Sequence, residues 1–550
     1  MHELINNWIV LLVALPMGAG VLTTLLRGHV TSQRLVGLTT LGTTLLLSVL
    51  FLFGLDGPTS MHLSHIGEWK PPYGIAIVFD GVSGVLLLVS SLVALACYLH
   101  SFSVLDRRVE KGWFHPLFHL LMMGVNFAFL TGDLFNLFVA FEIMLMASYA
   151  LLTLGGSRQT LSQAYKYVIL NLIGSTIFVL GAGIVYGMMG TLNYADLARM
   201  VAEAHANGEA LPRGFQSVAV MLLLVFGLKG AIFPLWFWLP DTYHTLPTSI
   251  AGLFAALLSK IGVYAILRLF PMIFAAPGVN ERGVVFTILA GAAFTTMIVA
   301  ILGAFGERRI RRMLSLVLIS HVGYLIFGIA LMAESDRALG ATLMYMAQEM
   351  LVMAALFMCC GMIEKHTGSD DLNEIGGVLS RAPWLATAFF LCFASVVGIP
   401  PLPGFFGKFV LVTEGFRSDK WWISGLLTPA ILVTAVLTMA VMVKIWAFAF
   451  WGEVKGRLLS LPHGAQAGAL PPLGAAFAGV WMLLAVVGAV TLGSESYVNF
   501  TIQAAGVMAE PKPYVEHVLG EGTWPEPLHA ETIDETRSLA MSALEEGATQ

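Results

Sequence analysis

Charged side chains are scarce in this sequence. Asp, Glu, Lys and Arg make up 11% of its 550 residues, whereas 57% are hydrophobic. Because a soluble globular chain carries about a quarter charged residues, this composition excludes an ordinary soluble domain. The formal net charge of −5 does not point to a charged partner, since most charges lie in loops, and no nucleic-acid partner is expected. The sequence indicates a protein that crosses a membrane many times.

Cysteine is also rare, and its placement excludes two kinds of site. Cys97, Cys359, Cys360 and Cys392 all lie inside apolar segments, and no pair has the spacing of metal ligands. We expect buried core residues, not disulfides or cluster ligands. Phosphate-binding loops, dinucleotide fingerprints and nucleophile elbows are missing too. We therefore expect neither an enzyme nor a bound metal or cofactor.

Long apolar segments fill most of the chain. A spanning helix needs about 20 apolar residues, and about fourteen segments qualify. The first lacks a basic flank, which favours a span over a cleaved signal. The prediction is an all-α membrane protein. Its expected spans lie at 6–26, 35–53, 76–98, 114–131, 134–154, 166–188, 216–238, 247–268, 284–304, 312–332, 340–362, 384–414, 424–450 and 472–493.

The seventh and twelfth segments contain glycine and proline in their interiors, so we expect broken helices there. Each is fourth in a block of five, helices 4–8 and 9–13, and each has a lysine beside the break, Lys229 and Lys408. Paired interruptions of this kind indicate two inverted repeats with a transport site between their halves. The expected units are 1–112, 113–270, 280–455, 456–493 and a polar, acidic extramembrane tail, 494–550, with a short helix near 530–546.

Loop charge predicts the orientation. Loops after odd-numbered helices hold about twice as many Lys and Arg as loops after even-numbered ones, which places the odd loops in the cytoplasm. The strongest signal is ERRIRR at 307–312. We expect a multi-pass protein of a cell membrane, with both termini on the non-cytoplasmic side.

Four lysines lie within expected spans. Lys444 is near the end of its span, where snorkelling to the interface explains it about as well as function does, whereas Lys229, Lys260 and Lys408 are harder to explain in that way. Each costs about 2.5–3.5 kcal/mol on insertion scales, which a sequence tolerates when the charge faces a wet or protein-lined interior. We interpret them as members of an ion path; the plainer alternative is a set of structural ion pairs.

Glu142, about two turns into the fifth helix, is the matching anion. We predict that it pairs with Lys229, because an unpaired carboxylate at that depth is costly. Such a pair can switch, since a proton brought near Lys229 weakens the partnership, and this is a way to move protons. Asp133, at the start of the same helix, is interpreted as an N-cap.

Further polar residues are candidates for a proton relay. His321 lies mid-helix and His244 follows the first break, and imidazole titrates near neutral pH. Either is equally compatible with a hydrogen-bonded core histidine. Glu349 is a weaker candidate in the eleventh helix. Hydroxyl groups that can hold water on a secondary path come from Ser259, Thr245 and Thr248.

Four stretches carry a family resemblance: TGDLFNLFVAFEIMLMASY (131–149), the segment 229–260, LISHVGYL (318–325) and GIPPLPGFFGKF (398–409). They resemble the antiporter-like subunits shared by respiratory complex I and the Mrp multisubunit cation/proton antiporters, over roughly residues 70–455. GDLFNLF is most similar to the D-subunit branch of the Mrp antiporters. The resemblance implies fourteen helices, two inverted repeats and a central polar axis.

The resemblance also implies roles for matching residues. Glu142 and Lys229 would be the switching pair, Lys260 the central connector, His321 a bridge, and Lys408 the residue that opens toward one side. Two positions depart from the family pattern, because Gln348 and Met353 stand where the family usually has His and Lys, while Glu349 is retained. The middle of the path would then depend on His321, Glu349 and water.

The leading hypothesis is a proton-carrying subunit of an Mrp-type Na⁺/H⁺ antiporter. It would work with other membrane subunits, H⁺, lipid and a monovalent cation, which the resemblance implies is Na⁺. A second hypothesis is a proton-pumping subunit of a redox-driven complex, such as complex I or a membrane-bound hydrogenase. A third is a self-sufficient transporter or a scaffold with a vestigial channel.

Overall fold

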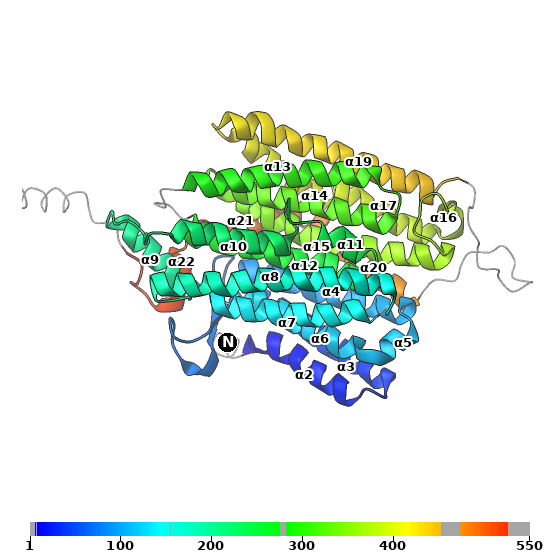
Figure 1. Ribbon diagram of the computed structural model, residues 1–550, viewed down its shortest axis with the longest axis horizontal. Helices are drawn as coiled ribbons and strands as arrows, with labels where there is room; N and C mark the ends of the chain where they lie inside the picture. The colour runs from blue at the N-terminus through cyan, green and yellow to red at the C-terminus, as the bar shows by residue number, and fades with distance from the viewer. Residues whose placement is uncertain (1–5, 7, 155, 276–281, 453–473, 526–550) are drawn as a thin grey trace, which may run out of the picture.

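The computed structural model describes residues 6, 8–154, 156–275, 282–452 and 474–525. Long helices lie side by side and run from one end of the molecule to the other (Figure 1). Smaller elements gather at the two ends. We call the end with β1, β2, α9 and α22 the hairpin end, and the opposite end, with α5, α16 and the loop of Arg308 and Arg309, the arginine end.

Eleven helical segments of the described residues are long and apolar enough to cross a bilayer, which agrees with the predicted all-α membrane protein. Three shorter apolar helices account for the remaining predicted spans: α2 (Leu11–Leu25), α10 (Phe215–Gly230) and α17 (Pro383–Val397). The eleven are α3 (Val30–Phe53), α4 (Gly81–Val104), α5 (Arg107–Val109) continuing through η2 (Glu110–Phe114) into α6 (His115–Leu130), α7 (Leu134–Thr153), α8 (Arg158–Met189), α12 (Thr248–Leu269) with η3 (Phe270–Phe274), α13 (Arg282–Gly306), α14 (Ile310–Ala330), α15 (Asp336–Thr367), η5 (Ile423–Leu427) with α19 (Thr428–Ala449), and α20 (Gly474–Leu492).

Both predicted helix breaks are present. The first separates α10 from the short α11 (Trp238–Tyr243), and the second separates α17 from α18 (Pro403–Arg417). Carbonyl groups freed at each break find side-chain donors. The Trp238 indole donates to the Leu228 carbonyl at 3.1 Å, and Lys408 donates to the Val396 carbonyl at 2.7 Å. A helix break is tolerated at membrane depth when the protein supplies hydrogen-bond partners for the freed backbone groups, as it does here.

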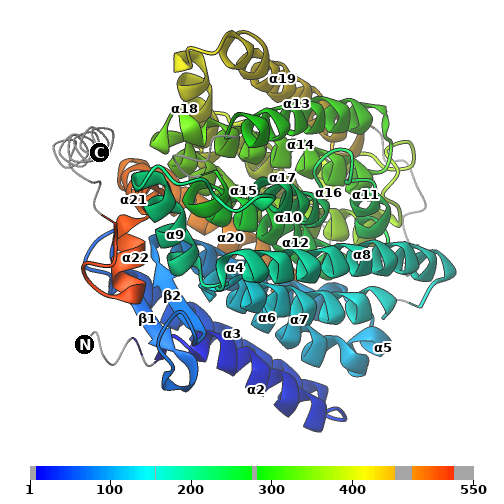
Figure 2. The ribbon, with the colours of Figure 1, turned by 60° about the vertical axis from the view of Figure 1, so that its left-hand side comes forward.

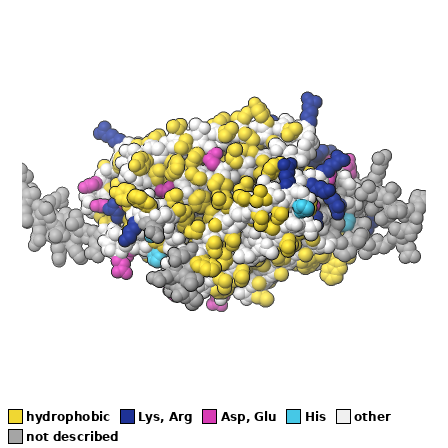
Figure 3. Space-filling model, turned by 90° about the horizontal axis from the view of Figure 1, so that it is seen from below, with side chains coloured by type: hydrophobic (Ala, Val, Ile, Leu, Met, Phe, Trp, Pro, Cys, Tyr) yellow, Lys and Arg dark blue, Asp and Glu magenta, His cyan; other side chains and the backbone are white. Residues whose placement is uncertain are grey.

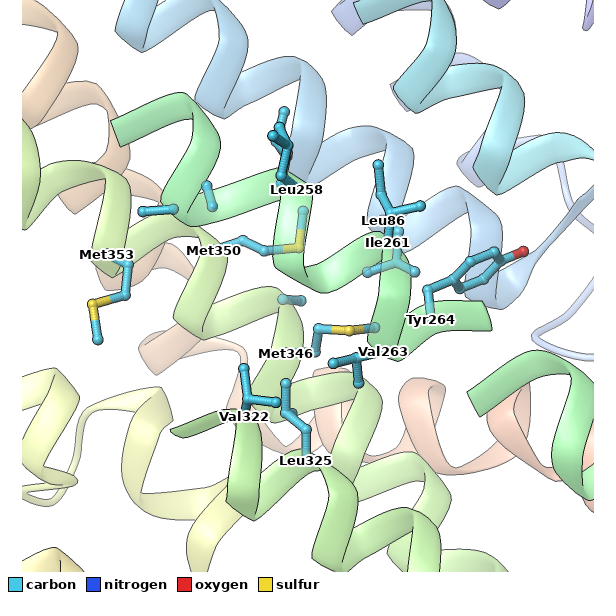
Figure 4. Close-up of a cluster of buried hydrophobic side chains, with 14 of the residues drawn as sticks. Leu86, Leu258, Ile261, Val263, Tyr264, Val322, Leu325, Met346, Met350 and Met353 are labelled. Carbon is cyan, nitrogen blue, oxygen red and sulfur yellow. The ribbon is translucent and has the colours of Figure 1, made fainter. Parts of the chain in front are cut away.

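Three helices form the interior of the bundle. In α12, α14 and α15, every residue of the most apolar stretch is buried against other helices. Figure 4 shows part of their contact, where Val263 of α12, Met346 of α15 and Leu325 of α14 gather in an apolar cluster. On one outer face, apolar side chains cover the middle and most charges lie toward the two ends (Figure 3). A charged group inside this bundle is therefore shielded from lipid.

The third predicted span begins later than expected. Residues 76–80 form the strand β2 (Ala76–Asp80), which pairs antiparallel with β1 (Met61–His65), with Met61 opposite Asp80. The helix starts at Gly81 because Asp80 caps it: the Asp80 carboxylate accepts from the Ser83 amide at 2.8 Å, and the Asp80 amide donates to the Ser83 hydroxyl oxygen. This is a capping box, which fixes the first turn of a helix.

The tail 494–525 contains two helices that the sequence did not lead us to expect, α21 (Ser494–Ala509) and α22 (Lys512–Leu519). Gly340 of α15 lies directly against Ile502 of α21, and Tyr514 of α22 is fully buried. This part of the tail belongs to the folded body, and the helix predicted near 530–546 lies outside the described residues. The remaining short elements are η1 (Ile66–Glu68), α9 (Tyr194–Ala206), η4 (Leu331–Ala333) and α16 (Val378–Arg381).

Candidate functional site

The first candidate group joins α7, α8 and α10. The Ser175 hydroxyl of α8 donates to Glu142 Oε1 of α7, and Lys229 Nζ of α10 donates to the Ser175 oxygen at 3.4 Å. The Lys229 ammonium also lies 4.8 Å from the centre of the Phe141 ring. We predicted a direct pair between Glu142 and Lys229; instead, Ser175 bridges them. The cause is packing, since α8 contacts both other helices and its small hydroxyl occupies the space between the charges.

The second group lies at the centre of the bundle. Lys260 Nζ of α12 is 3.1 Å from Glu349 Oε1 of α15, with side chains 0% and 1% exposed. His321 Nδ1 of α14 is 3.7 Å from the same oxygen. Glu349 was the weaker candidate from the sequence, yet it is the residue that contacts both Lys260 and His321. A buried ion pair is tolerated when its geometry is good and its partners stay in place.

Lys408 extends this group toward the second break. Its ammonium donates to the carbonyls of Val396 and Val397 at 2.7 and 3.2 Å. It also lies over the rings of Tyr324 and Tyr345, 5.0 and 5.7 Å from their centres.

The His321 ring packs against the same two tyrosines, with centroid separations of 5.5 and 5.8 Å. The side chains of Lys260, Glu349 and His321 thus connect to Lys408 through an aromatic pair.

The first and second groups are separated where α10 meets α12. A Cβ atom on Gly262 of α12 would lie 2.5 Å from the Gly230 amide of α10, so only glycine permits this approach. Within the described ranges, no hydrogen bond or ion pair joins Glu142, Ser175 or Lys229 to the group of Lys260, Glu349 and His321. The predicted line of ionisable groups is therefore divided into two clusters. Between them lies the close backbone contact of α10 and α12 at Gly230 and Gly262, which we call the seam.

The central group contains polar atoms that no protein group satisfies. Among the described residues these are Ser259 Oγ, Tyr345 OH, both ring nitrogens of His321 and the second carboxylate oxygen of Glu349, Oε2. A buried polar atom without a partner costs about 1–3 kcal/mol. Ordered water is the usual partner of such atoms, at about three hydrogen bonds per molecule. The centre has the chemistry of a water-holding site.

Three secondary candidates lie away from this centre. His244 bonds to the Pro240 carbonyl at 2.8 Å, and Thr245 donates to the Thr242 carbonyl. His244 also lines a hollow of about 450 Å³ at the arginine end. Thr248 lies against Gly361 of α15 near the start of α12. The hollow is lined by Gln159, His244, Gly306, Glu307, Arg308, Arg309, Arg312 and Asp371.

Sequence reasoning missed several members of the site. Ser175 lies in an ordinary apolar helix, and Tyr324 and Tyr345 resemble any buried aromatic residue. His100 of α4 was missed as well; it lies outside both groups, with its ring nitrogens 2.9 Å from Ser249 Oγ and 3.1 Å from the Met358 carbonyl. No local pattern distinguishes these residues, because their partners come from distant segments. By contrast, the predicted N-cap at Asp133 is confirmed by its 2.8 Å bond from the Asn136 amide.

Comparisons with known proteins agree with this architecture. The family described as NADH:quinone oxidoreductase/Mrp antiporter, transmembrane, matches residues 131–450. Among similar proteins, the Na⁺/H⁺ antiporter D subunit of Alkalihalophilus pseudofirmus is 36% identical over 517 residues, covering 94% of this chain and 100% of that one. The corresponding D subunit of Bacillus subtilis is 34% identical over 523 residues, again 94% and 100%.

Solved structures extend the comparison. A chain of the Mrp complex from Dietzia sp. DQ12-45-1b matches with a TM-score of 0.81 and 29% identity, covering 94% of this chain and 99% of that one. A chain of respiratory complex I from Thermus thermophilus shares the fold at a TM-score of 0.75 and 22% identity, with 93% and 100% covered. Identity above 30% along the full length of two antiporter D subunits carries the assignment. This chain belongs to the NADH:quinone oxidoreductase/Mrp antiporter family, in its Na⁺/H⁺ antiporter D-subunit branch.

Proposed function

We propose that this chain carries the proton half of a Na⁺/H⁺ exchange, as one subunit of a multisubunit membrane antiporter. The observation that carries the proposal is the buried group of Lys260, Glu349 and His321, in which the lysine and histidine nitrogens lie 3.1 and 3.7 Å from one carboxylate oxygen. Ionisable residues inside a membrane protein ordinarily mark an ion or proton path. The proposed path requires no bound cofactor or metal.

The first step takes place at Glu142, Ser175 and Lys229. A proton that reaches Glu142 neutralises the carboxylate, and the Ser175 hydroxyl then loses the charge that orients it. The hold on the Lys229 ammonium weakens, because charge-assisted hydrogen bonds are roughly twice as strong as neutral ones. Lys229 lies in the last turn of α10, one residue before the helix ends at Gly230, so its backbone can shift when that hold is lost. This movement lets it deliver a proton across the seam at Gly262.

The second step runs through the central group. Lys260 first gives its own proton to Glu349, and the neutral amine then accepts the proton from Lys229. His321 and water carry the proton on from Glu349 to Lys408, which releases its own proton beside the second break and is protonated again along this path. Glu349 acts here without the histidine and lysine that the family usually has in this helix. Gln348 contributes a neutral contact there, a 2.9 Å hydrogen bond to Ser395. In this proposal 113–270 and 280–455 act as two antiporter repeats, each with one broken helix.

The arginine end faces the cytoplasm in this proposal, and the hairpin end, where α2 starts and α22 lies, faces the opposite side. The concentration of arginine at 308–312 supports it through the positive-inside rule. The hollow beside His244 then opens to the cytoplasm. His244, Thr245 and Thr248 would pass protons between the cytoplasm and the interior near this hollow. Ser259 would hold water beside Lys260.

The experiment replaces Lys229 with alanine in the assembled complex and measures Na⁺-dependent proton movement in membrane vesicles. We expect antiport to be lost. Lys444→Ala is the matched control, since Lys444 also lies in a span but donates to the carbonyls of Phe305 and Glu307 at the end of α13. Full activity of Lys229→Ala, with normal complex assembly, would refute the proposed path.

The redox-driven alternative has weaker support. The sulfane sulfur reductase and complex I structures match at 23% and 22% identity, which speaks for the fold alone. Flavin and iron–sulfur subunits in the purified complex would favour that alternative, and small membrane subunits alone would favour the antiporter. Antiport by the chain reconstituted without partners would favour a self-sufficient transporter.

A further inference from the structure

A second buried charged cluster lies on α12, on the hairpin-end side of the central group. Arg268 Nη2 is 2.5 Å from Asp80 Oδ2, and their side chains are 2% and 4% exposed. The Arg268 guanidinium lies 5.1 Å from the centre of the Tyr514 ring, which belongs to the tail helix α22. No step of the proposed proton path uses these residues. A buried ion pair of this kind adds little to stability compared with apolar packing, so its retention calls for another reason.

The cluster lies in line with Lys260. Residues four apart share one face of a helix, and Lys260, Tyr264 and Arg268 follow this spacing on α12. Eight residues correspond to about 12 Å along a helix.

Met272, one turn further, lines a hollow of about 550 Å³ at the hairpin end, between α9 and the tail segment 509–512. On this face of α12, Arg268 therefore lies between the central lysine and the hollow.

The two side chains that α12 itself places on this route, Tyr264 and Arg268, are poor proton relays, and the Asp80 carboxylate is held by Arg268. A relay group must accept a proton and release it, whereas a guanidinium carries five N–H donors, no acceptor and a permanent charge. Arg268 Nε and Nη1 have no acceptor among the described residues, so the buried guanidinium has more donors than its surroundings satisfy. The Tyr264 hydroxyl donates to the Phe129 carbonyl at 3.0 Å, which occupies its proton. An arginine placed in this way is a known barrier to protons and cations in membrane channels.

We propose that Arg268, Asp80 and Tyr514 form a seal that stops protons held at Lys260 from escaping along α12 to the hairpin-end hollow. The inference rests on the proposed function, because a seal matters only if Lys260 holds mobile protons. Asp80 keeps the guanidinium in place, since the same carboxylate caps α4 and is fixed there by the Ser83 amide. Tyr514 covers the guanidinium, which gives the tail helix a part in transport.

The test replaces Arg268 with histidine, which can accept and release a proton, in the assembled complex. Vesicles receive a pH gradient without Na⁺, and its passive decay is followed with a pH-sensitive dye. We expect decay several-fold faster than in the wild type. Arg34→His is the matched control, because Arg34 also pairs with a buried carboxylate, Glu110 at 2.6 Å, but lies on α3 away from this route.

Two further variants keep the test decisive if Arg268→His assembles poorly. Tyr514→Ala removes the cover and leaves the ion pair, and we expect it to leak as well. Adding Lys260→Ala to either leaking variant should return the decay to the wild-type rate, because the leak would start at Lys260. Decay no faster than that of Arg34→His in both variants, or a leak that persists without Lys260, overturns the seal. Failure of the proposed function shows separately, as full antiport by Lys229→Ala.

Discussion

Replacing Glu349 with glutamine removes one charge from the centre of the bundle while keeping the shape of the side chain. At 3.1 Å from Lys260, and with an effective dielectric constant of about 20, the lost attraction is about 5 kcal/mol. Desolvation offsets part of this, and removing one partner of a buried pair costs about 3–5 kcal/mol. The lower figure corresponds to about a hundredfold change in any equilibrium that needs Lys260 as a cation.

We therefore expect Glu349→Gln to lower Na⁺-dependent proton movement at least about tenfold. Assembly of the complex is checked by purification and is expected to persist. Glu364→Gln is the control on the same helix, since Glu364 pairs with Arg311 at 3.2 Å but its side chain is 38% exposed. A pair this exposed contributes about 0–1 kcal/mol. Glu349→Asp keeps the charge and should retain partial activity. Equal antiport in Glu349→Gln and Glu364→Gln would contradict the reasoning.

Three other substitutions give separate checks. Ser175→Ala removes the bridge and a charge-assisted hydrogen bond of about 1.5–3 kcal/mol, so antiport should fall about tenfold or more, with Ser175→Thr close to wild type in the same vesicle assay. Gly262→Ala forces a methyl group against the Gly230 amide; overpacking of about 1–3 kcal/mol should lower the thermal stability of the purified complex, and an unchanged melting temperature would argue against the close contact. Asp133→Ala loses the cap on the Asn136 amide, about 1 kcal/mol, and should lower that temperature slightly without changing antiport.

The spans and both breaks were predictable from the sequence because their causes are local. Twenty apolar residues span a bilayer whatever their neighbours, and proline and glycine interrupt a helix wherever they occur. The predicted start of the third span was wrong because residues 76–79 are apolar whether they form a strand or a helix. They form a strand because they pair with residues 61–65, and the local sequence does not reveal that pairing. The same limit applies to α21, whose buried face depends on α15 being next to it.

The residues of the candidate site also fall into those that the sequence could predict and those that it could not. Lys229, Lys260 and Lys408 stood out because burying a charge is costly, which is a property of each residue alone. The central place of Glu349 depends on which helices meet, and so does the Ser175 bridge. The direct Glu142–Lys229 pair was predicted by assuming that opposite charges touch. A hydroxyl on a third helix was sufficient to separate them.

One oxygen atom of Glu349 faces both Lys260 and His321. A carboxylate oxygen can accept two hydrogen bonds, but Lys260 lies closer than His321, at 3.1 against 3.7 Å, so a gain of positive charge on His321 draws the carboxylate away from Lys260. The arrival of charge on one side therefore loosens the grip on the other. Such competition gives the Glu349 side chain two alternative conformations, one closer to Lys260 and one closer to His321. The change needs a side-chain rotation and no helix movement.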